Sequence, residues 1–143
     1  VTQSVGNLDQ MTQQNAALVE ESAAAAESLR DQAAQLAQAV AQLQALGGKT
    51  HHLYSALVIY ENGLPIWRHI GHARLTMRTA TPSFLTEYVA RNWHSIQHSV
   101  GGYKIEEEGL RLFTDIEGDT FTIQGLPLLP LINYLIIKGV MAA

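Results

Sequence analysis

Several side chains in the second half of the sequence have types and spacings that could do chemistry. Glu117 and Asp119 flank a single glycine, and carboxylates this close could share a divalent cation. The same Glu-Gly-Asp run also suits a tight turn between strands, so both interpretations stay open. His94 and His98 have the four-residue spacing of a helical metal-binding pair, although no third ligand is evident and ordinary surface histidines are more common. The run Glu106–Glu108 is typical of a solvated loop.

Four segments between residues 47 and 96 predict the elements that would position these groups. β-Branched and aromatic residues dominate the first, and the turn signal Asn62-Gly63 predicts that a second strand returns beside it. An alternating pattern then predicts a third, half-buried strand, and Thr81 before Pro82 predicts a capped helix start. The expected ranges are strands at 52–60, 64–70 and 73–79, and a helix from 82 to about 93.

The end of the chain predicts a second hairpin and a closing helix. Strands are expected at 110–116 and 120–124, on either side of the Glu-Gly-Asp turn. Residues 126–138 are apolar and are expected to form a helix that ends at Gly139. Hairpins mixed with helices favour an α/β (α+β) fold, here a mixed-sheet domain over residues 47–143 with two hairpins and a closing helix.

Residues 1–46 predict one long helix that needs a partner. The segment has no proline, is rich in Ala, Gln, Glu and Leu, and is followed by Gly47-Gly48. We expect a coiled-coil-type helix that self-associates or folds back on the rest of the chain; a flexible Ala/Gln linker is the alternative. Positions with alternating spacings of four and three form an unbroken heptad seam: Val1, Val5, Leu8, Thr12, Asn15, Val19, Ser22, Ala26, Leu29, Ala33, Leu36, Val40 and Leu43.

Charge and composition exclude several classes of function. Residues 1–46 hold five acids and one base, and the remaining residues balance, so the basic stripe of a nucleic-acid-binding protein is lacking. No apolar run reaches the roughly 18 residues that cross a bilayer, and the first 30 residues do not resemble a secretory signal. The sequence has no cysteine, which fits a reducing compartment. We therefore expect a soluble cytoplasmic protein without nucleic-acid or membrane partners.

Part of the long helix resembles a known signalling helix. Residues 11–25 (MTQQNAALVEESAAA) are similar to the final methylation helix of bacterial methyl-accepting chemotaxis receptors, and residues 29–40 continue the likeness. The resemblance implies that Glu20 and Glu21, which have small neighbours on both sides, are candidates for carboxylate methylation. The receptors' kinase-contacting tip and other methylation helix do not occur in this sequence. A coiled-coil stalk with two solvated glutamates is therefore the alternative interpretation.

Residues from about 46 onward resemble the C-terminal half of Maf-type nucleotide pyrophosphatases. Three stretches carry the resemblance, namely 46–56 (LGGKTHHLYSA), 99–106 (SVGGYKIE) and 113–131 (FTDIEGDTFTIQGLPLLPL). One departure is Thr120, which separates Asp119 from the aromatic Phe121. The resemblance implies that the domain belongs to enzymes that hydrolyse nucleoside triphosphates to monophosphate and pyrophosphate with a divalent metal such as Mg²⁺.

The resemblance also assigns candidate roles. Glu106 is expected to recognise the base of a nucleotide, and Lys49 and His51 could face phosphates or be ordinary solvated loop residues. The family's Ser-x-Arg-Arg loop, Gly-Ala-Asp-Thr segment and Glu-Lys-Pro segment are absent, so no catalytic residue is assigned. We expect a pyrophosphatase fragment, fused to the receptor-like helix 1–46, that is inactive alone. A non-catalytic coiled-coil interaction or chemotaxis-signalling module is the alternative, and whether the chain is an enzyme stays open.

Overall fold

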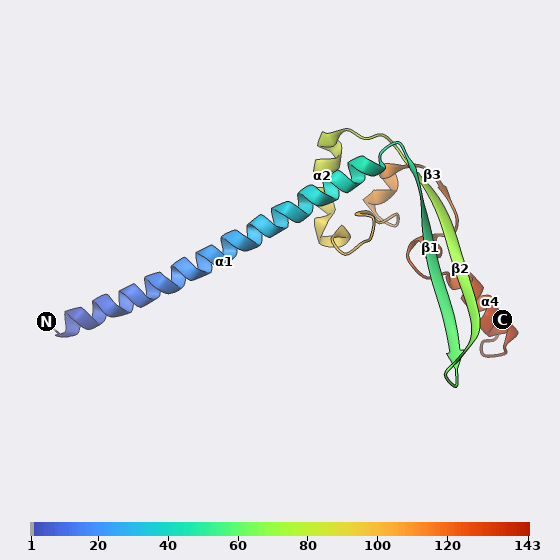
Figure 1. Cartoon of the computed structure of the whole chain (residues 1–143), viewed down its shortest axis with the longest axis horizontal. Helices are drawn as coiled ribbons and strands as arrows, with labels where there is room; N and C mark the ends of the chain where they lie inside the picture. The colour runs from blue at the N-terminus through green and yellow to red at the C-terminus, as the bar shows by residue number, and fades with distance from the viewer. Residues whose placement is uncertain (1) are drawn as a thin grey trace. The chain divides into compact units, whose positions relative to one another are not determined.

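The structure is a computed structural model, and it describes residues 2–143. Two compact units divide between Ala39 and Val40, inside the first helix. The elements follow in the order α1, β1, β2, α2, a 3₁₀ helix η1, β3, α3 and α4 (Figure 1). The division at 46/47 that the sequence predicts stays a prediction.

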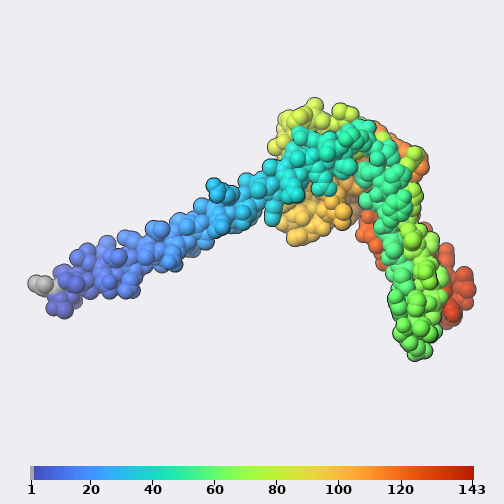
Figure 2. Space-filling model, viewed as in Figure 1, coloured from blue at the N-terminus to red at the C-terminus, as the bar shows by residue number. Residues whose placement is uncertain are grey.

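The long N-terminal helix is confirmed. Helix α1 spans Thr2–Leu46, and its N-terminal part, coloured blue, appears in the space-filling view as a rod one helix wide (Figure 2). It ends at the expected glycines, because the Gly47 amide donates to the Leu43 carbonyl at 3.0 Å and Gly48 has a φ of 71°. That positive φ suits glycine and stops the helix. The Gly48 amide then donates to the Met77 carbonyl at 3.0 Å, which ties the end of α1 to the sheet.

The first hairpin is also confirmed, with a longer second strand than expected. Strands β1 (Thr50–Glu61) and β2 (Leu64–Met77) pair antiparallel around Asn62 and Gly63, whose φ values of 51° and 79° fit the expected turn. The expected separate strands at 64–70 and 73–79 are one strand. Gly71, which interrupts the sequence pattern, is not a break: a Cβ there would collide with the side chain of Thr122, so glycine allows close packing.

The predicted second hairpin is wrong. Residues 108–112 form η1 (Glu108–Leu112), strand β3 (Phe113–Glu117) pairs antiparallel with β2, and residues 120–123 form the short helix α3 (Thr120–Ile123). The reason is local, because the Asp119 carboxylate accepts a hydrogen bond from the Thr122 amide at 2.9 Å and so caps a helix rather than a turn. The described strands lie in the order β1-β2-β3 and are all antiparallel, not mixed as expected.

Two further helices complete the unit. Helix α2 (Pro82–Ile96) starts as predicted, with the Thr81 hydroxyl accepting from the Phe84 amide at 3.2 Å, and it runs one turn past Trp93. Helix α4 (Leu128–Ile137) is the predicted closing helix, and its Tyr134 ring stacks on Trp67 of β2 at 4.8 Å. None of the described helices is long and apolar enough to cross a membrane. The fold agrees with the expected α+β class.

The core of residues 40–143 lies between α2, the inner face of the sheet and the last turn of α1. Ala73, Leu75 and Met77 on the inner face of β2 are buried, and so is the apolar face of α2. Fully buried apolar side chains of this core include Leu43, Leu75, Met77, Leu85, Tyr88, Val89, Ile96 and Leu112. This core fixes one end of β1 and the C-terminal end of α2, the elements from which the candidate site is built.

Candidate functional site

An open groove of about 1170 Å³ runs along β1. Four consecutive residues of β1, Leu53 to Ala56, line one wall. Because neighbouring residues of a strand point to opposite faces, a wall made of four in a row is a strand edge rather than a face. No described strand pairs with that edge of β1. The other walls come from the end of α2, the loop 98–107 and the end of α3, with Ile123, Gln124 and Gly125.

Charged side chains in the groove come from the loop after α2. Glu106 is exposed there, whereas Glu107 accepts a hydrogen bond from the Ser95 hydroxyl at 2.7 Å and lies 3.8 Å from the Lys104 ammonium nitrogen. His94 and Ser95 contribute from α2, and His98 follows just after it. Glu106 is thus the one groove carboxylate that makes no hydrogen bond or ion pair with the described residues.

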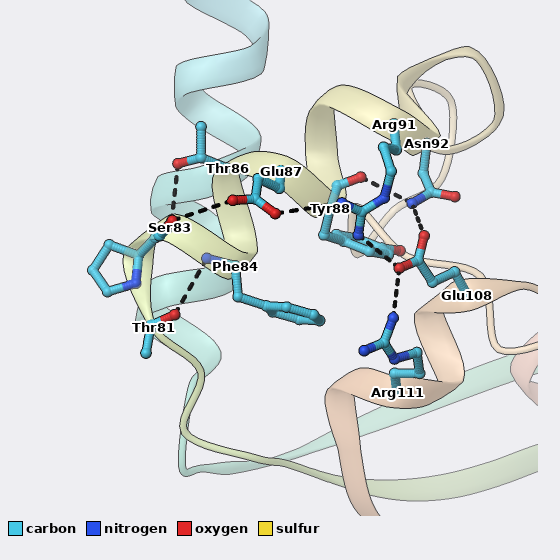
Figure 3. A network of polar contacts seen from close by, with 11 residues as sticks. Thr81, Ser83, Phe84, Thr86, Glu87, Tyr88, Arg91, Asn92, Glu108 and Arg111 are labelled. Carbon is cyan, nitrogen blue, oxygen red and sulfur yellow. Dashed lines mark hydrogen bonds and ion pairs between the residues drawn. The ribbon is translucent and has the colours of Figure 1, made fainter.

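A polar clamp fixes this loop against α2 (Figure 3). The Glu108 carboxylate accepts hydrogen bonds from Arg91 at 2.8 Å, Asn92 at 2.8 Å and Arg111 at 3.0 Å. The hydrogen bonds from Arg91 and Asn92 lower the pKa of Glu108 to about 2. Asn92 also donates to the Tyr88 carbonyl at 2.9 Å, so the clamp joins η1 to the backbone of α2. The loop that presents Glu106 is therefore held at its C-terminal end.

The floor of the groove rests on a buried aromatic cluster. The Tyr103 hydroxyl lies 2.7 Å from Nε2 of His51, and the Tyr103 ring packs edge-on against Phe113 at 4.8 Å. Burial raises the pKa of Tyr103 to about 12. Burial, and then the neighbouring His52, lower the pKa of His51, and its Nδ1 is buried without a partner among residues 2–143. A neutral His51 is therefore held under the groove and supports Tyr103.

The three residues expected to bind substrate are not brought together. Glu106 lies in the groove, His51 lies beneath it behind Tyr103, and Lys49 is exposed and does not line it. The strand explains the separation, because His51 belongs to the inner face of β1 while Lys49 precedes the strand. Their roles toward a nucleotide stay predictions, and the geometry favours Glu106 alone.

The carboxylates suggested for a metal have other partners. Both Glu117 oxygens contact the Arg74 guanidinium, with the Arg74 Nε at 3.0 Å. Hydrogen bonds from the side chain and then the backbone of Thr122 lower the pKa of Asp119. Within residues 2–143 no three His, Asp or Glu side chains are grouped to hold a cation. Glu117 and Asp119 are therefore engaged by protein groups, and their role as ligands of Mg²⁺ stays a prediction.

Several groove residues were not singled out from the sequence for a role in a site. Tyr54, Ser95 and Lys104 line the groove. Lys104 lies inside the motif 99–106 and could have been selected from that position. Tyr54 and Ser95 had no such signal, because their place depends on which edge of the sheet stays open and on how the loop returns to α2.

Comparison with known proteins identifies the family. A family model described as Maf-like protein matches residues 9–137. A nucleoside triphosphate pyrophosphatase of Ruegeria pomeroyi is 58% identical over 102 residues, which are 71% of this chain and 51% of that protein. The corresponding enzyme of Hyphomonas neptunium is 48% identical over 111 residues, 78% of this chain and 56% of its own length. A 7-methyl-GTP pyrophosphatase of Rhizobium johnstonii is 50% identical over 100 residues, 70% of this chain and 50% of that protein.

These matches correct the expected extent of the likeness. The chain spans about half the length of the curated relatives it matches. The family match begins at residue 9 rather than at about 46, so it takes in most of α1. The chemoreceptor resemblance of residues 1–46 and the methylation of Glu20 and Glu21 stay predictions. With the match covering residues 9–137, the chain belongs to the Maf-like protein family.

Proposed function

We propose that the groove along β1 binds a nucleoside triphosphate and that the chain serves its hydrolysis to nucleoside monophosphate and pyrophosphate. The observation that supports this most directly is the position of Glu106, a carboxylate in the groove along β1 without a partner among residues 2–143. Two of the relatives are named nucleoside triphosphate pyrophosphatases and one is named for 7-methyl-GTP. A purine or pyrimidine edge offers N–H donors, and a free carboxylate is a strong acceptor for them.

The groove supports a division of the nucleotide between two ends. Glu106 presents its carboxylate from the loop, whereas the Tyr54 ring is stacked on His72 at 4.6 Å on the exposed face of the sheet. A free acceptor suits the N–H donors of a base through hydrogen bonding. His94, His98 and Lys104 are the remaining groups that can carry positive charge in the groove, and they suit phosphate oxygens. Base recognition by Glu106 is therefore the role that we assign.

Charge limits what these residues do alone. Lys104, Glu106 and Glu107 give the groove one lysine and two carboxylates, and Lys104 is paired with Glu107 at 3.8 Å. A triphosphate with several negative charges needs cationic donors where charge develops on the leaving pyrophosphate. Residues 2–143 present no such cluster in the groove, nor a fitted metal site. We propose that they supply binding, and that the fragment without further cationic groups and Mg²⁺ ligands turns over poorly or not at all.

The test is pyrophosphate release from a panel of standard nucleoside triphosphates and 7-methyl-GTP with MgCl₂. The matched pair is Glu106→Ala in the groove and Glu61→Ala at the exposed hairpin turn. Release that disappears in Glu106→Ala and persists in Glu61→Ala supports the enzymatic form of the proposal. Binding without release supports a binding role that needs a further partner. A panel that neither binds nor reacts overturns the nucleotide site.

A second candidate function has its own observation. The heptad seam of α1 is exposed from Leu8 to Ala33, with Leu8 at 63% and Leu29 at 66% of their surface, and a seam of this kind is what a coiled-coil partner covers. We propose that residues 1–46 self-associate and act as an interaction module, in a chain located in the cytoplasm. If the chemoreceptor resemblance extends to function, a receptor methyltransferase adds a methyl group to Glu20 or Glu21. Intact mass after the reaction, with a Glu20→Gln and Glu21→Gln variant as control, tests this.

A further inference from the structure

Helix α1 carries a pattern of volume and charge that selects one partner. Its seam positions from Leu8 to Ala33 are exposed and belong to one helical unit. Within residues 8–33 bulky apolar seam residues occur only at Leu8, Val19 and Leu29, while the positions between them hold small or polar residues. Such a seam packs well only against a surface that places bulk opposite its small residues.

Two copies that lie parallel and in register satisfy this requirement badly. Each seam residue would then face its own copy, so Thr12, Ser22 and Ala26 would each meet an identical small residue. Leu8, Val19 and Leu29 would meet their own copies in layers that suit a parallel pair, but these are only three of the eight layers between residues 8 and 33. The layers between them would be underpacked, and gaps of this kind cost packing energy.

An antiparallel pair centred between Val19 and Ser22 places bulky residues opposite small ones much better. In antiparallel helices the a positions face d positions of the partner, so Leu8 meets Ala33, Thr12 meets Leu29 and Val19 meets Ser22. Each of these layers combines one larger and one smaller side chain. Only the layer of Asn15 with Ala26 has no bulky apolar group. By symmetry every layer occurs twice, over 26 residues or about 39 Å of helix.

The charges flanking the seam select the same register independently. Two of the flanking e and g positions between residues 4 and 39 are charged, Asp9 and Arg30, and both are e positions. In an antiparallel pair e faces e of the partner, and the register set by the seam places Asp9 beside Arg30 twice. In a parallel pair each e position faces g of the partner, where Asp9 would meet Ser4 and Arg30 would meet Ala25. Glu20, the first of the acidic pair, is at a b position and points away from the seam.

We propose that α1 binds a second copy of this chain as an antiparallel coiled coil, with Leu8 packed on Ala33 and Asp9 paired with Arg30 of the other copy. The proposal extends the self-association proposed above and is independent of the nucleotide groove. Variants at these helix positions leave Glu106 and its loop unchanged, so their effects on association and on pyrophosphate release can be separated.

The first experiment uses disulfide cross-linking of the full chain. The sequence has no cysteine, so introduced thiols are the only ones present. Single variants Leu8→Cys and Ala33→Cys are mixed in equal amounts, oxidised in a thiol redox buffer and separated by intact mass, which distinguishes the three possible dimers. The antiparallel pair predicts the mixed 8–33 dimer. Homodimers of each variant would instead show a parallel pair, and an absence of any cross-linked dimer would show that the helix does not self-associate; either result overturns the proposal.

A second experiment avoids the loss of a seam leucine. In sedimentation equilibrium Asp9→Lys and Arg30→Glu are each expected to raise the dimer dissociation constant about tenfold, and the double variant to restore it. Asp31→Lys makes the same charge change as Asp9→Lys, but at an f position away from the seam. It is expected to change the dimer dissociation constant less than twofold. Equal effects of Asp9→Lys and Asp31→Lys, or no rescue in the double variant, would contradict the antiparallel register.

Discussion

The clamp around Glu108 gives the sharpest stability prediction. Its pKa falls from 4.5 to about 2 because Arg91 and Asn92 donate to its ionised form. At about 1.36 kcal/mol per pKa unit this corresponds to an upper bound of about 3 kcal/mol. The side chains of Arg91 and Arg111 are 48% and 64% exposed, so solvent screening reduces the value. We expect Glu108→Gln to lower the free energy of unfolding by about 1–2 kcal/mol at pH 7.

The assay is urea unfolding followed by tryptophan fluorescence, since Trp67 and Trp93 both lie in the unit that contains the clamp. A carboxyl whose pKa is lowered by folding stabilises the protein above its unfolded pKa and loses this contribution as the pH falls toward its folded pKa. The difference in free energy of unfolding between wild type and Glu108→Gln is therefore largest above about pH 4.5, and it becomes smaller as the pH falls toward 2. The matched control is Glu87→Gln, whose ion pair with Arg91 is longer, at 3.6 Å, and more exposed.

The control variant Glu87→Gln is expected to lower the free energy of unfolding by less than about 0.5 kcal/mol. Equal losses for Glu87→Gln and Glu108→Gln, or a Glu108→Gln loss that does not narrow with falling pH, would refute the clamp as the cause. The clamp also predicts a functional effect, because it holds the loop that presents Glu106 in the groove. Glu108→Gln is expected to weaken nucleotide binding without removing any group that contacts the nucleotide.

Three further predictions follow from particular contacts. Gly71→Ala is expected to destabilise the chain by about 1–3 kcal/mol in urea unfolding because its Cβ has no room, whereas Gly6→Ala, with open space around it, should raise helix content slightly by circular dichroism. The lowered pKa of His51 means that the unfolded chain binds the proton more readily, so stability should fall as the pH drops below about 6.5; His51→Asn should flatten this dependence. Asp119→Ala should lower the free energy of unfolding by about 1 kcal/mol because the cap of α3 is lost. Asp119→Asn, which can still cap, should lower it less, and Asp115→Ala at an exposed position should change it little. A loss for Asp119→Asn as large as that for Asp119→Ala would argue against capping.

Local signals in the sequence predict much of this fold. The helix 2–46 follows from composition and from its terminal glycines, and the first hairpin follows from Asn62-Gly63 between two β-rich segments. The Thr81 cap is likewise a local hydrogen bond. Each of these features is decided by residues within a few positions of one another, which is the range over which pattern and propensity act.

The errors arise where contacts distant in sequence decide the outcome. The sequence predicts two strands, 64–70 and 73–79, yet β2 is continuous, and Gly71 marks the place where Thr122 packs onto it. Asp119 is a local exception: the sequence predicts a turn there, yet its carboxylate caps α3 through the amide of Thr122, three residues along. The site shows the same limit, since the sequence selects Glu106, but only the open edge of β1 and the clamped loop show that it shares a groove with Tyr54 and Lys104.

The most direct test of the nucleotide site is a calorimetric titration of the full chain with a non-hydrolysable nucleoside triphosphate and MgCl₂. The site predicts saturable binding that Glu106→Ala weakens at least tenfold and that Glu61→Ala leaves within twofold of wild type. Binding that survives Glu106→Ala unchanged would place the nucleotide elsewhere. An absence of binding at any nucleotide concentration tested would contradict the central claim.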